Sequence, residues 1–181
     1  AHNNETRVLF GDGLGGFPHI DKYTTGNATR AVIVGDFDID GDDDIVTANR
    51  DDGTMNHLEN QGTGLFTIST FNPAGNGESA LALADANNDG NADFFLGFYN
   101  GQKIALYLGD GLGNFTFSSE MPVIGNPWMI TAADFNGDGF ADEASANALG
   151  NKTCLIFGDG EGGLERRHDT RCPWQRRTRR D

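Results

Sequence analysis

Three short stretches of the chain carry oxygen-bearing side chains at alternate positions. They read DFDIDGDDD from Asp36, DANNDGNAD from Asp85 and DFNGDGFAD from Asp134. Each fits the pattern D-x-[DN]-x-D-G-x-x-D, in which alternate residues of a tight loop can turn their oxygens toward one centre. Carboxylates, an amide and a backbone carbonyl make a hard oxygen cage, which suits Ca²⁺ better than zinc or copper. We therefore predict up to three calcium sites, one in each loop.

The predicted ligands stand at positions one, three, five, seven and nine of each loop. A glycine at position six allows the sharp bend, and position seven varies, so it would contribute its backbone carbonyl. The ligand positions are Asp36, Asp38, Asp40, Asp42 and Asp44 in loop one, Asp85, Asn87, Asp89, Asn91 and Asp93 in loop two, and Asp134, Asn136, Asp138, Phe140 and Asp142 in loop three. Positions one, three, five and nine supply four carboxylates in loop one and three in each other loop. If the geometry is equal, we expect loop one to bind most tightly.

An acidic loop can also be nothing more than a soluble turn. Here, however, three copies keep the acids, the glycine and the spacing while their surroundings change, and carboxylates converging on one point repel each other without a counterion. The loops are not EF-hands, because position twelve is Thr47, Leu96 or Ser145 instead of the bidentate glutamate. The predicted role of calcium is to lock the crossover between two strands, not to perform chemistry.

The acidic loops return at a period of 49 residues, and a glycine-rich stretch shares that period. FGDGLGGF, from Phe10 to Phe17, fits the G-x-G-x-x-G pattern of a dinucleotide-binding loop. It returns as ENQGTGLF, LGDGLGNF and FGDGEGGL. A cofactor loop is needed once and is followed by a helix, whereas this stretch recurs between short alternating segments. It is therefore predicted to be a structural β-hairpin turn, and no cofactor beyond the metal is expected.

Each unit of the repeat contains four short apolar segments and no sustained helical spacing. Four short antiparallel strands at this period describe a propeller blade, so the predicted fold class is all-β. Residues 1–164 form the predicted propeller repeats. They comprise a half-blade at 7–23 and blades at about 28–71, 77–120 and 126–168. Closed propellers have four to eight blades, so about three and a half blades predict a piece of a larger propeller, or assembly with chains that cover the open edges.

The charge of the chain is unevenly distributed. The net charge is −14, but the first 164 residues carry 24 acidic and only 6 basic groups. Such an acidic body repels nucleic acid, and no apolar run approaches the length of a membrane span. The basic segment 165–181 departs from the repeat, and we interpret it as a disordered or atypical end in preference to a polyanion-binding arm.

The Asp-rich loop between two strands, together with the phenylalanine-glycine hairpin, resembles the FG-GAP/VCBS repeat found in integrin α-subunits and many secreted proteins. The resemblance covers roughly Arg7 to Leu164. A literal Gly-Ala-Pro is absent, and NPAGNG and VIGNPW stand in its place, which is nearer the VCBS-like branch. The resemblance implies a β-propeller, commonly of seven blades, with calcium on one face and partners on the opposite face or the sides. It also implies an extracellular or cell-surface location.

The expected function is adhesion or binding of a protein or glycan, without catalysis. Every prominent acid is explained by the repeat, whereas an active site should break the symmetry. His57 breaks it where Leu106 and Leu155 are aligned, and we expect it to be a partly exposed strand residue. Trp128 could stack on a sugar or fill space between blades. The alternatives are a structural subunit of an extracellular fibre or matrix, and a carbohydrate-active enzyme that uses an Asp pair or the metal.

Overall fold

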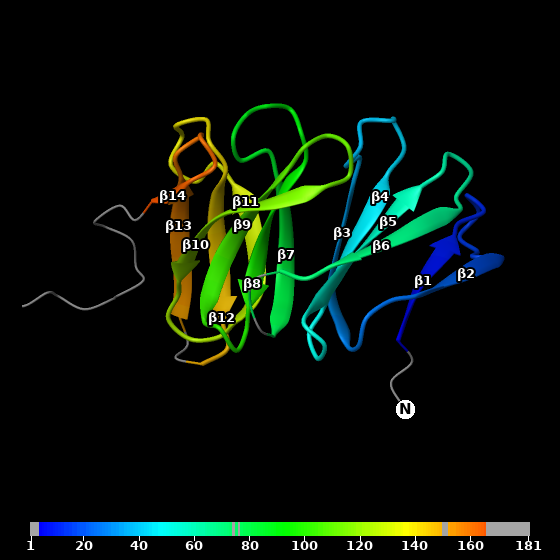
Figure 1. Ribbon diagram of the computed structural model, residues 1–181, viewed down its shortest axis with the longest axis horizontal. Coiled ribbons are helices and arrows are strands. Elements are labelled where there is room, and N and C mark those ends of the chain that lie inside the picture. Colours follow the sequence, from blue (N-terminus) through cyan, green and yellow to red (C-terminus); the bar gives the residue numbers. More distant parts are fainter. Residues whose placement is uncertain (1–3, 74, 76, 150–151, 166–181) are drawn as a thin grey trace, which may run out of the picture.

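The computed structural model describes residues 4–73, 75, 77–149 and 152–165. Its regular elements in these ranges are all strands (Figure 1). The first two, β1 (Glu5–Phe10) and β2 (His19–Thr24), form a two-stranded antiparallel ribbon. The predicted basic segment, apart from Glu165, lies outside the described residues.

Three four-stranded antiparallel sheets follow the ribbon, and in each of them consecutive strands are neighbours. The first sheet holds β3 (Thr29–Gly35), β4 (Asp44–Asn49), β5 (Thr54–Asn60) and β6 (Phe66–Phe71). The second holds β7 (Glu78–Ala84), β8 (Asp93–Phe98), β9 (Lys103–Gly109) and β10 (Phe115–Pro122). The third holds β11 (Pro127–Ala133), β12 (Asp142–Asn147), β13 (Lys152–Gly158) and β14 (Leu164–Glu165). The predicted fold class is confirmed, with three blades of four antiparallel strands and one two-stranded piece.

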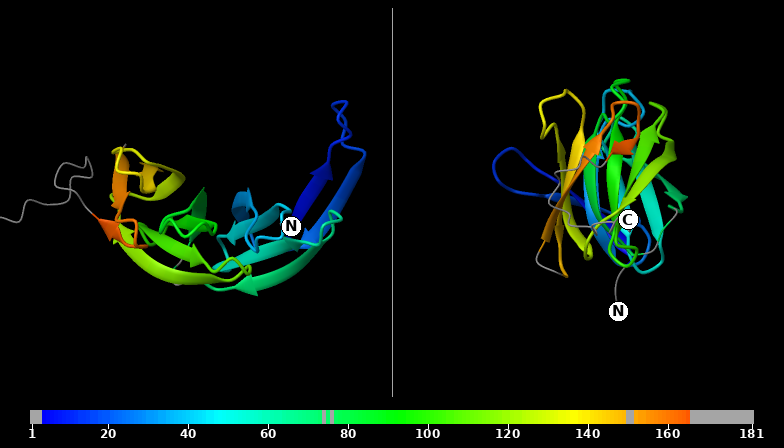
Figure 2. Two further views of the ribbon diagram at one scale, coloured as in Figure 1. Left: turned by 90° about the horizontal axis from the view of Figure 1, so that it is seen from above. Right: turned by 90° about the vertical axis from the view of Figure 1, so that its left-hand side faces the viewer.

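The sheets stack face to face along an arc, with β3, β7 and β11 on its concave side and β6 and β10 on its convex side (Figure 2). The packing explains why β8 is buried along its whole length. Phe94, Leu96 and Phe98 belong to the core between the first and second sheets, whereas Phe95 belongs to the core between the second and third. Each such buried side chain contributes about 1.5 to 3 kcal/mol of hydrophobic stabilisation. The stack therefore holds the loops at the strand ends in fixed positions.

The glycine-rich stretch forms the hairpin turn that its recurrence predicts. The Asp12 backbone N–H donates to the Gly16 carbonyl at 3.0 Å, and the Asp12 carboxylate accepts from the N–H groups of Leu14 and Gly16. Asp110 and Asp159 repeat both features in later blades. The motif is thus a side-chain-capped turn that closes a blade, and the G-x-G-x-x-G match has this structural explanation.

Candidate metal centres

The three Asp-rich loops join the first and second strands of each blade, at the same end of the stack. Loop one lies between β3 and β4, loop two between β7 and β8, and loop three between β11 and β12. The short loop must reverse the chain between two paired strands, so its backbone N–H groups turn inward. Position-six glycines Gly41, Gly90 and Gly139 have φ values of 96°, 86° and 90°. The bend predicted at this position is therefore present in all three loops.

The inward N–H groups meet the predicted ligand side chains in a repeated pattern. In loop two, Asp85 accepts from the N–H groups of Asp89 and Gly90, at 3.1 Å each. Asn87 Oδ1 accepts from the Asp89 N–H, and Asp89 accepts from the Asn91 N–H. The same contacts recur in loop one, and loop three differs only in that Asp134 accepts from Gly137 in place of position five. The side chains at positions one, three and five are thus folded over the loop, with further oxygen lone pairs available to a cation.

Position nine has a distinct role in all three blades. Asp44, Asp93 and Asp142 are fully buried. One carboxylate oxygen of Asp93 accepts from the Ala86 N–H and the other from the Gly109 N–H, both at 2.8 Å. Asp44 and Asp142 bind the equivalent pairs of N–H groups. Each position-nine carboxylate therefore ties its loop to the end of the third strand. The structure explains this residue by hydrogen bonding, and its role as a metal ligand stays a prediction.

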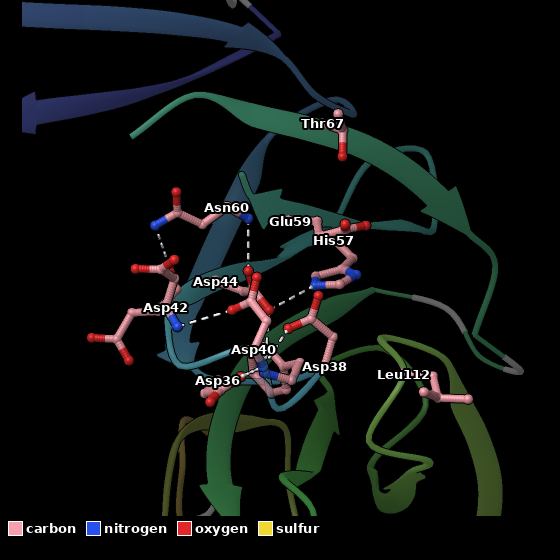
Figure 3. A network of polar contacts seen from close by, with 12 residues as sticks. Asp36, Asp38, Asp40, Asp42, Asp44, His57, Glu59, Asn60, Thr67 and Leu112 are labelled. Atoms are coloured by element: carbon pink, nitrogen blue, oxygen red, sulfur yellow. Dashed lines mark hydrogen bonds and ion pairs between the residues drawn. The ribbon is translucent and has the colours of Figure 1, made fainter. Parts of the chain in front are cut away.

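Loop one holds a compact group of acids. Carboxylate oxygens of Asp36, Asp38 and Asp40 all lie within 4.8 Å of one another, and Figure 3 shows them gathered beside Asp44. Burial, followed by the negative charge of Asp44, raises the pKa of the Asp38 carboxyl above its ordinary value. A cation at this point would relieve both effects, because it replaces lost hydration and offsets the like charges. The donor set is therefore chemically suited to a hard divalent cation such as Ca²⁺.

Loops two and three place an asparagine where loop one has Asp38. In loop two the Asn87 side-chain amide donates to Asp89 at 2.9 Å. Hydrogen bonds from the Asn91 N–H and then from Asn87 lower the pKa of Asp89. Those from Gly139 and Gly137 lower the pKa of Asp134. Hydrogen bonding therefore favours the ionised form of Asp89 and Asp134, whereas burial raises the pKa of the position-nine carboxyls Asp93 and Asp142. The order of affinity among the loops stays a prediction.

His57 is more buried than the sequence analysis predicts. It was expected to be partly exposed, yet only 3% of it is accessible. The hairpin of the next blade covers it, since a Cβ on Gly113 would lie 2.9 Å from its ring, and Phe37 and Phe115 contact it edge to face. Its Nε2 lies 3.5 Å from Asp44 Oδ2 (Figure 3). Sequence reasoning missed this because hairpin coverage by a neighbouring blade depends on tertiary packing.

Other side chains missed from the sequence lie at the far end of the blades. A hollow there is lined by Arg30, Arg50 and Trp128. Tyr99 borders it, because its ring contacts Trp128 and Arg50. The signal was present in the spacing, since positions 30, 79 and 128 are one repeat position and positions 50, 99 and 148 are another.

No helix in the described part of the chain is long and apolar enough to cross a membrane.

Comparisons with known proteins agree with this architecture. A family model described as an FG-GAP-like repeat matches residues 36–96 and 85–145. Among solved structures, the chain is similar to an Agrocybe aegerita lectin that specifically recognises non-reducing terminal N-acetylglucosamine. The TM-score is 0.56 at 17% identity, over 91% of this chain and 46% of the lectin chain, so this chain spans about half the lectin's length. No relative is found among the curated proteins.

Proposed function

This chain belongs to the FG-GAP-like repeat family, and from that premise we propose that it is a non-catalytic β-propeller module that binds calcium and a glycan. The loops would hold up to three Ca²⁺ ions and stabilise the blades. The ligand would be recognised on another surface, outside the cell or at its surface. Placement in the VCBS-like branch is part of this proposal.

The observation that carries the calcium part is the repeated loop geometry. Asp36, Asp38 and Asp40 bring three carboxylates within 4.8 Å of one another, on a loop whose hydrogen bonds recur in the other two blades. When bound, Ca²⁺ would supply a fixed positive charge that links the oxygens of each loop. The chain's own contribution is to orient those oxygens through backbone N–H groups and to anchor the loop through position nine. Calcium would therefore act on stability, because it binds the folded loop and not the unfolded chain.

Glycan binding is supported by the fold shared with a lectin. At 17% identity this likeness concerns architecture alone, so the ligand of the lectin is not transferred. A protein ligand and a structural role in an extracellular fibre or matrix are the competing proposals. Catalysis is disfavoured because neither comparison points to a catalytic family, and the acids of the three loops recur in every blade.

We also propose that further blades or a second copy of the chain complete the propeller. The described sheets form an open arc instead of a closed ring (Figure 2). The sheet faces at the two ends of such an arc would favour association with other blades, because unpaired faces and edges promote contact with further protein. The mass of the protein in solution, measured by light scattering, distinguishes a second copy from a monomer.

A glycan array, probed with the purified chain in calcium and again in chelator, tests the proposed function. Selective binding that disappears in chelator is expected. Equal binding in both conditions would remove the link to calcium, and no binding would favour the structural role. Release of new reducing ends from a bound glycan would show instead that the chain is a carbohydrate-active enzyme.

A further inference from the structure

The end of the blades opposite the metal loops carries a site that the repeat does not explain. One repeat position, the second residue of the innermost strand, is Arg30 in the first blade, Ser79 in the second and Trp128 in the third. A second position, just after the second strand, is Arg50, Tyr99 or Ala148. At both positions every blade presents a different chemistry, so their combination occurs at one place only in the described arc.

Strand geometry directs the first set of side chains. The pairing register shifts between Thr29 and Ala31, between Glu78 and Ala80, and between Pro127 and Met129. Arg30, Ser79 and Trp128 are therefore the extra residues of three equivalent β-bulges. A bulge re-aims a side chain away from the regular alternation, and bulges are frequent beside binding sites. Arg30 and Trp128 thus leave the blade core by the same device and reach one surface, whereas Ser79 stays buried, with its hydroxyl donating to the Gly97 and Pro127 carbonyls.

The surface around these residues is hollowed into a groove. A cavity of about 220 Å³ is lined by Arg30, Arg50, Ser79, Trp128 and Met129. A neighbouring hollow of about 270 Å³ shares four of these residues and extends along the innermost strands. Each is smaller than the roughly 300–1,000 Å³ of pockets for drug-sized ligands. A ligand of one or two rings fits this size.

Trp128 is held in place while much of it remains open to solvent. Half of its surface is accessible, and its ring meets Tyr99 edge to face at 5.7 Å. The Asn126 side chain donates to the Tyr99 carbonyl at 2.6 Å, and the Ser79 hydroxyl lies 2.7 Å from the Pro127 carbonyl. These contacts fix the backbone on both sides of the groove. A rigid, half-open indole offers a flat apolar face at little entropic cost.

The charge of the groove is opposite to that of the rest of the described chain. Its lining holds two arginines and no acid, although the first 164 residues carry only 6 basic groups against 24 acidic ones. Arg30 is exposed and has no ion-pair partner among the described residues. Arg50 lies with its guanidinium 5.5 Å from the Tyr99 ring centroid, and its Nε lies 3.8 Å from Asp51 Oδ1, so Arg30 is the main source of unpaired positive charge. A single anionic group would be repelled elsewhere on this surface and attracted here.

We propose that this groove binds a sugar ring that carries one anionic group, a carboxylate or a sulfate. The sugar's C–H face lies on Trp128, and its anionic group accepts hydrogen bonds from Arg30, whose planar guanidinium suits such oxygens. A polyphosphate or nucleic acid is disfavoured because the surrounding acids repel an extended chain of charges. The inference rests on the proposed glycan-binding function, and it specifies the surface and the ligand class.

Calorimetric titration of the full chain, at fixed calcium, tests the proposal with three probes. These are a galactose oligomer that ends in a single galacturonate, the same oligomer with a single 6-sulfate, and the neutral galactose oligomer. We expect one or both anionic probes to bind and the neutral oligomer to bind at least tenfold more weakly. Arg30→Gln should weaken anionic binding by about tenfold or more, since it removes a charge-assisted hydrogen bond. Trp128→Ala should weaken it similarly, and Trp128→Phe less.

Arg7→Gln is the matched control, because Arg7 is an exposed strand arginine on the distant ribbon and its loss should leave binding unchanged. Anionic binding that survives Arg30→Gln and Trp128→Ala would place the ligand elsewhere, such as on the basic segment or a calcium ion, and would overturn the proposal while leaving glycan binding intact. Preference for the neutral oligomer would overturn the ligand class only. Binding of none of the probes would overturn the proposal, and the glycan array then decides separately whether the proposed function fails with it.

Discussion

The two ends of β3, β7 and β11 come from the same repeat yet follow opposite rules. At the metal-loop end, each blade keeps aspartates at positions one, five and nine and the glycine at position six. The position-nine residues Asp44, Asp93 and Asp142 accept from equivalent pairs of backbone N–H groups. At the other end, the equivalent position changes in every blade, from Arg30 to Ser79 to Trp128. The difference shows that identity between blades marks what the stack needs, whereas variation is free to create a single asymmetric surface.

Replacing a position-nine carboxylate should have the largest effect. Asp93→Ala is expected to lower the free energy of unfolding by about 3 to 5 kcal/mol, since the N–H groups of Ala86 and Gly109 lose their acceptor in a buried place. Urea unfolding in chelator measures this without a calcium contribution. The control is Asp110→Ala in an exposed hairpin, where about 1 kcal/mol is expected. Equal losses would refute the structural role of position nine.

One buried acid departs from the repeat inside the stack, and it should lower the free energy of unfolding by an amount that depends on pH. Glu143 stands where the other blades have Ile45 and Phe94. It is fully buried, and burial raises its pKa to about 8 against a smaller opposing effect of the Ser145 side chain. The folded protein holds this proton more tightly than the unfolded chain, so the contribution of Glu143 to stability is greatest at low pH and falls as pH rises from about 4.5 to 8, by roughly 1.4 kcal/mol per unit.

Glu143→Gln removes that ionisation and should be more stable than the natural chain by a few kcal/mol at pH 8, with the advantage shrinking toward pH 5. Thermal or urea unfolding across this pH range, performed on both proteins, gives the difference directly. Glu161→Gln, on a hairpin turn where Glu161 is exposed, should show no such trend. A constant difference between the natural chain and Glu143→Gln would contradict the assignment of the proton to Glu143.

Loop one has one more carboxylate than each of the other loops, and removing it should have a smaller effect, on calcium affinity. Asp38→Asn gives loop one the donor set of loops two and three. It should weaken calcium binding at that loop by about tenfold, equivalent to about 1.4 kcal/mol. Asn136→Asp should act in the opposite direction in loop three. Calcium titration followed by calorimetry compares the two, and unchanged affinity in both variants would show that charge does not set the order.

The groove should contribute least to stability. Arg30→Gln is expected to change the free energy of unfolding by no more than about 0.5 kcal/mol, because Arg30 is exposed. Trp128→Ala should cost about 1 kcal/mol, since half of the side chain is already in solvent. The same urea unfolding experiment measures both. A loss as large as that of Asp93→Ala would mean that this end of the strands is also a structural element.

Much of the architecture could be predicted because it is periodic. The strands, the hairpin turns and the positions of the Asp-rich loops follow from the apolar segments, the glycine-rich stretches and the Asp-rich loops, which all share one period. The double hydrogen bonding at position nine could not, because it depends on the third strand, about 16 residues further along the chain. The burial of His57 could not either, since a hairpin of the next blade creates it.

The groove is an intermediate case. Residues 30, 79 and 128 could be aligned from the period, but their sequence neighbours do not show that each stands at a β-bulge, or that Arg30 and Trp128 are exposed there while Ser79 is buried. Glu143 could be recognised as an acid among apolar aligned residues, whereas its burial between two sheets follows only from their stacking. Periodicity therefore predicts which residues are equivalent, and packing between blades decides what each one contacts.

Thermal unfolding of the chelator-stripped chain, repeated across a calcium titration with magnesium as control, tests the central claim most directly. Occupation of even one loop at a hundredfold excess over its dissociation constant adds about 2.7 kcal/mol, which raises the melting temperature by about 5 °C or more for a domain of this size. We predict such a rise with calcium and a much smaller one with magnesium. A melting temperature indifferent to calcium would contradict the account, because the three loops would then be acidic turns and not metal sites.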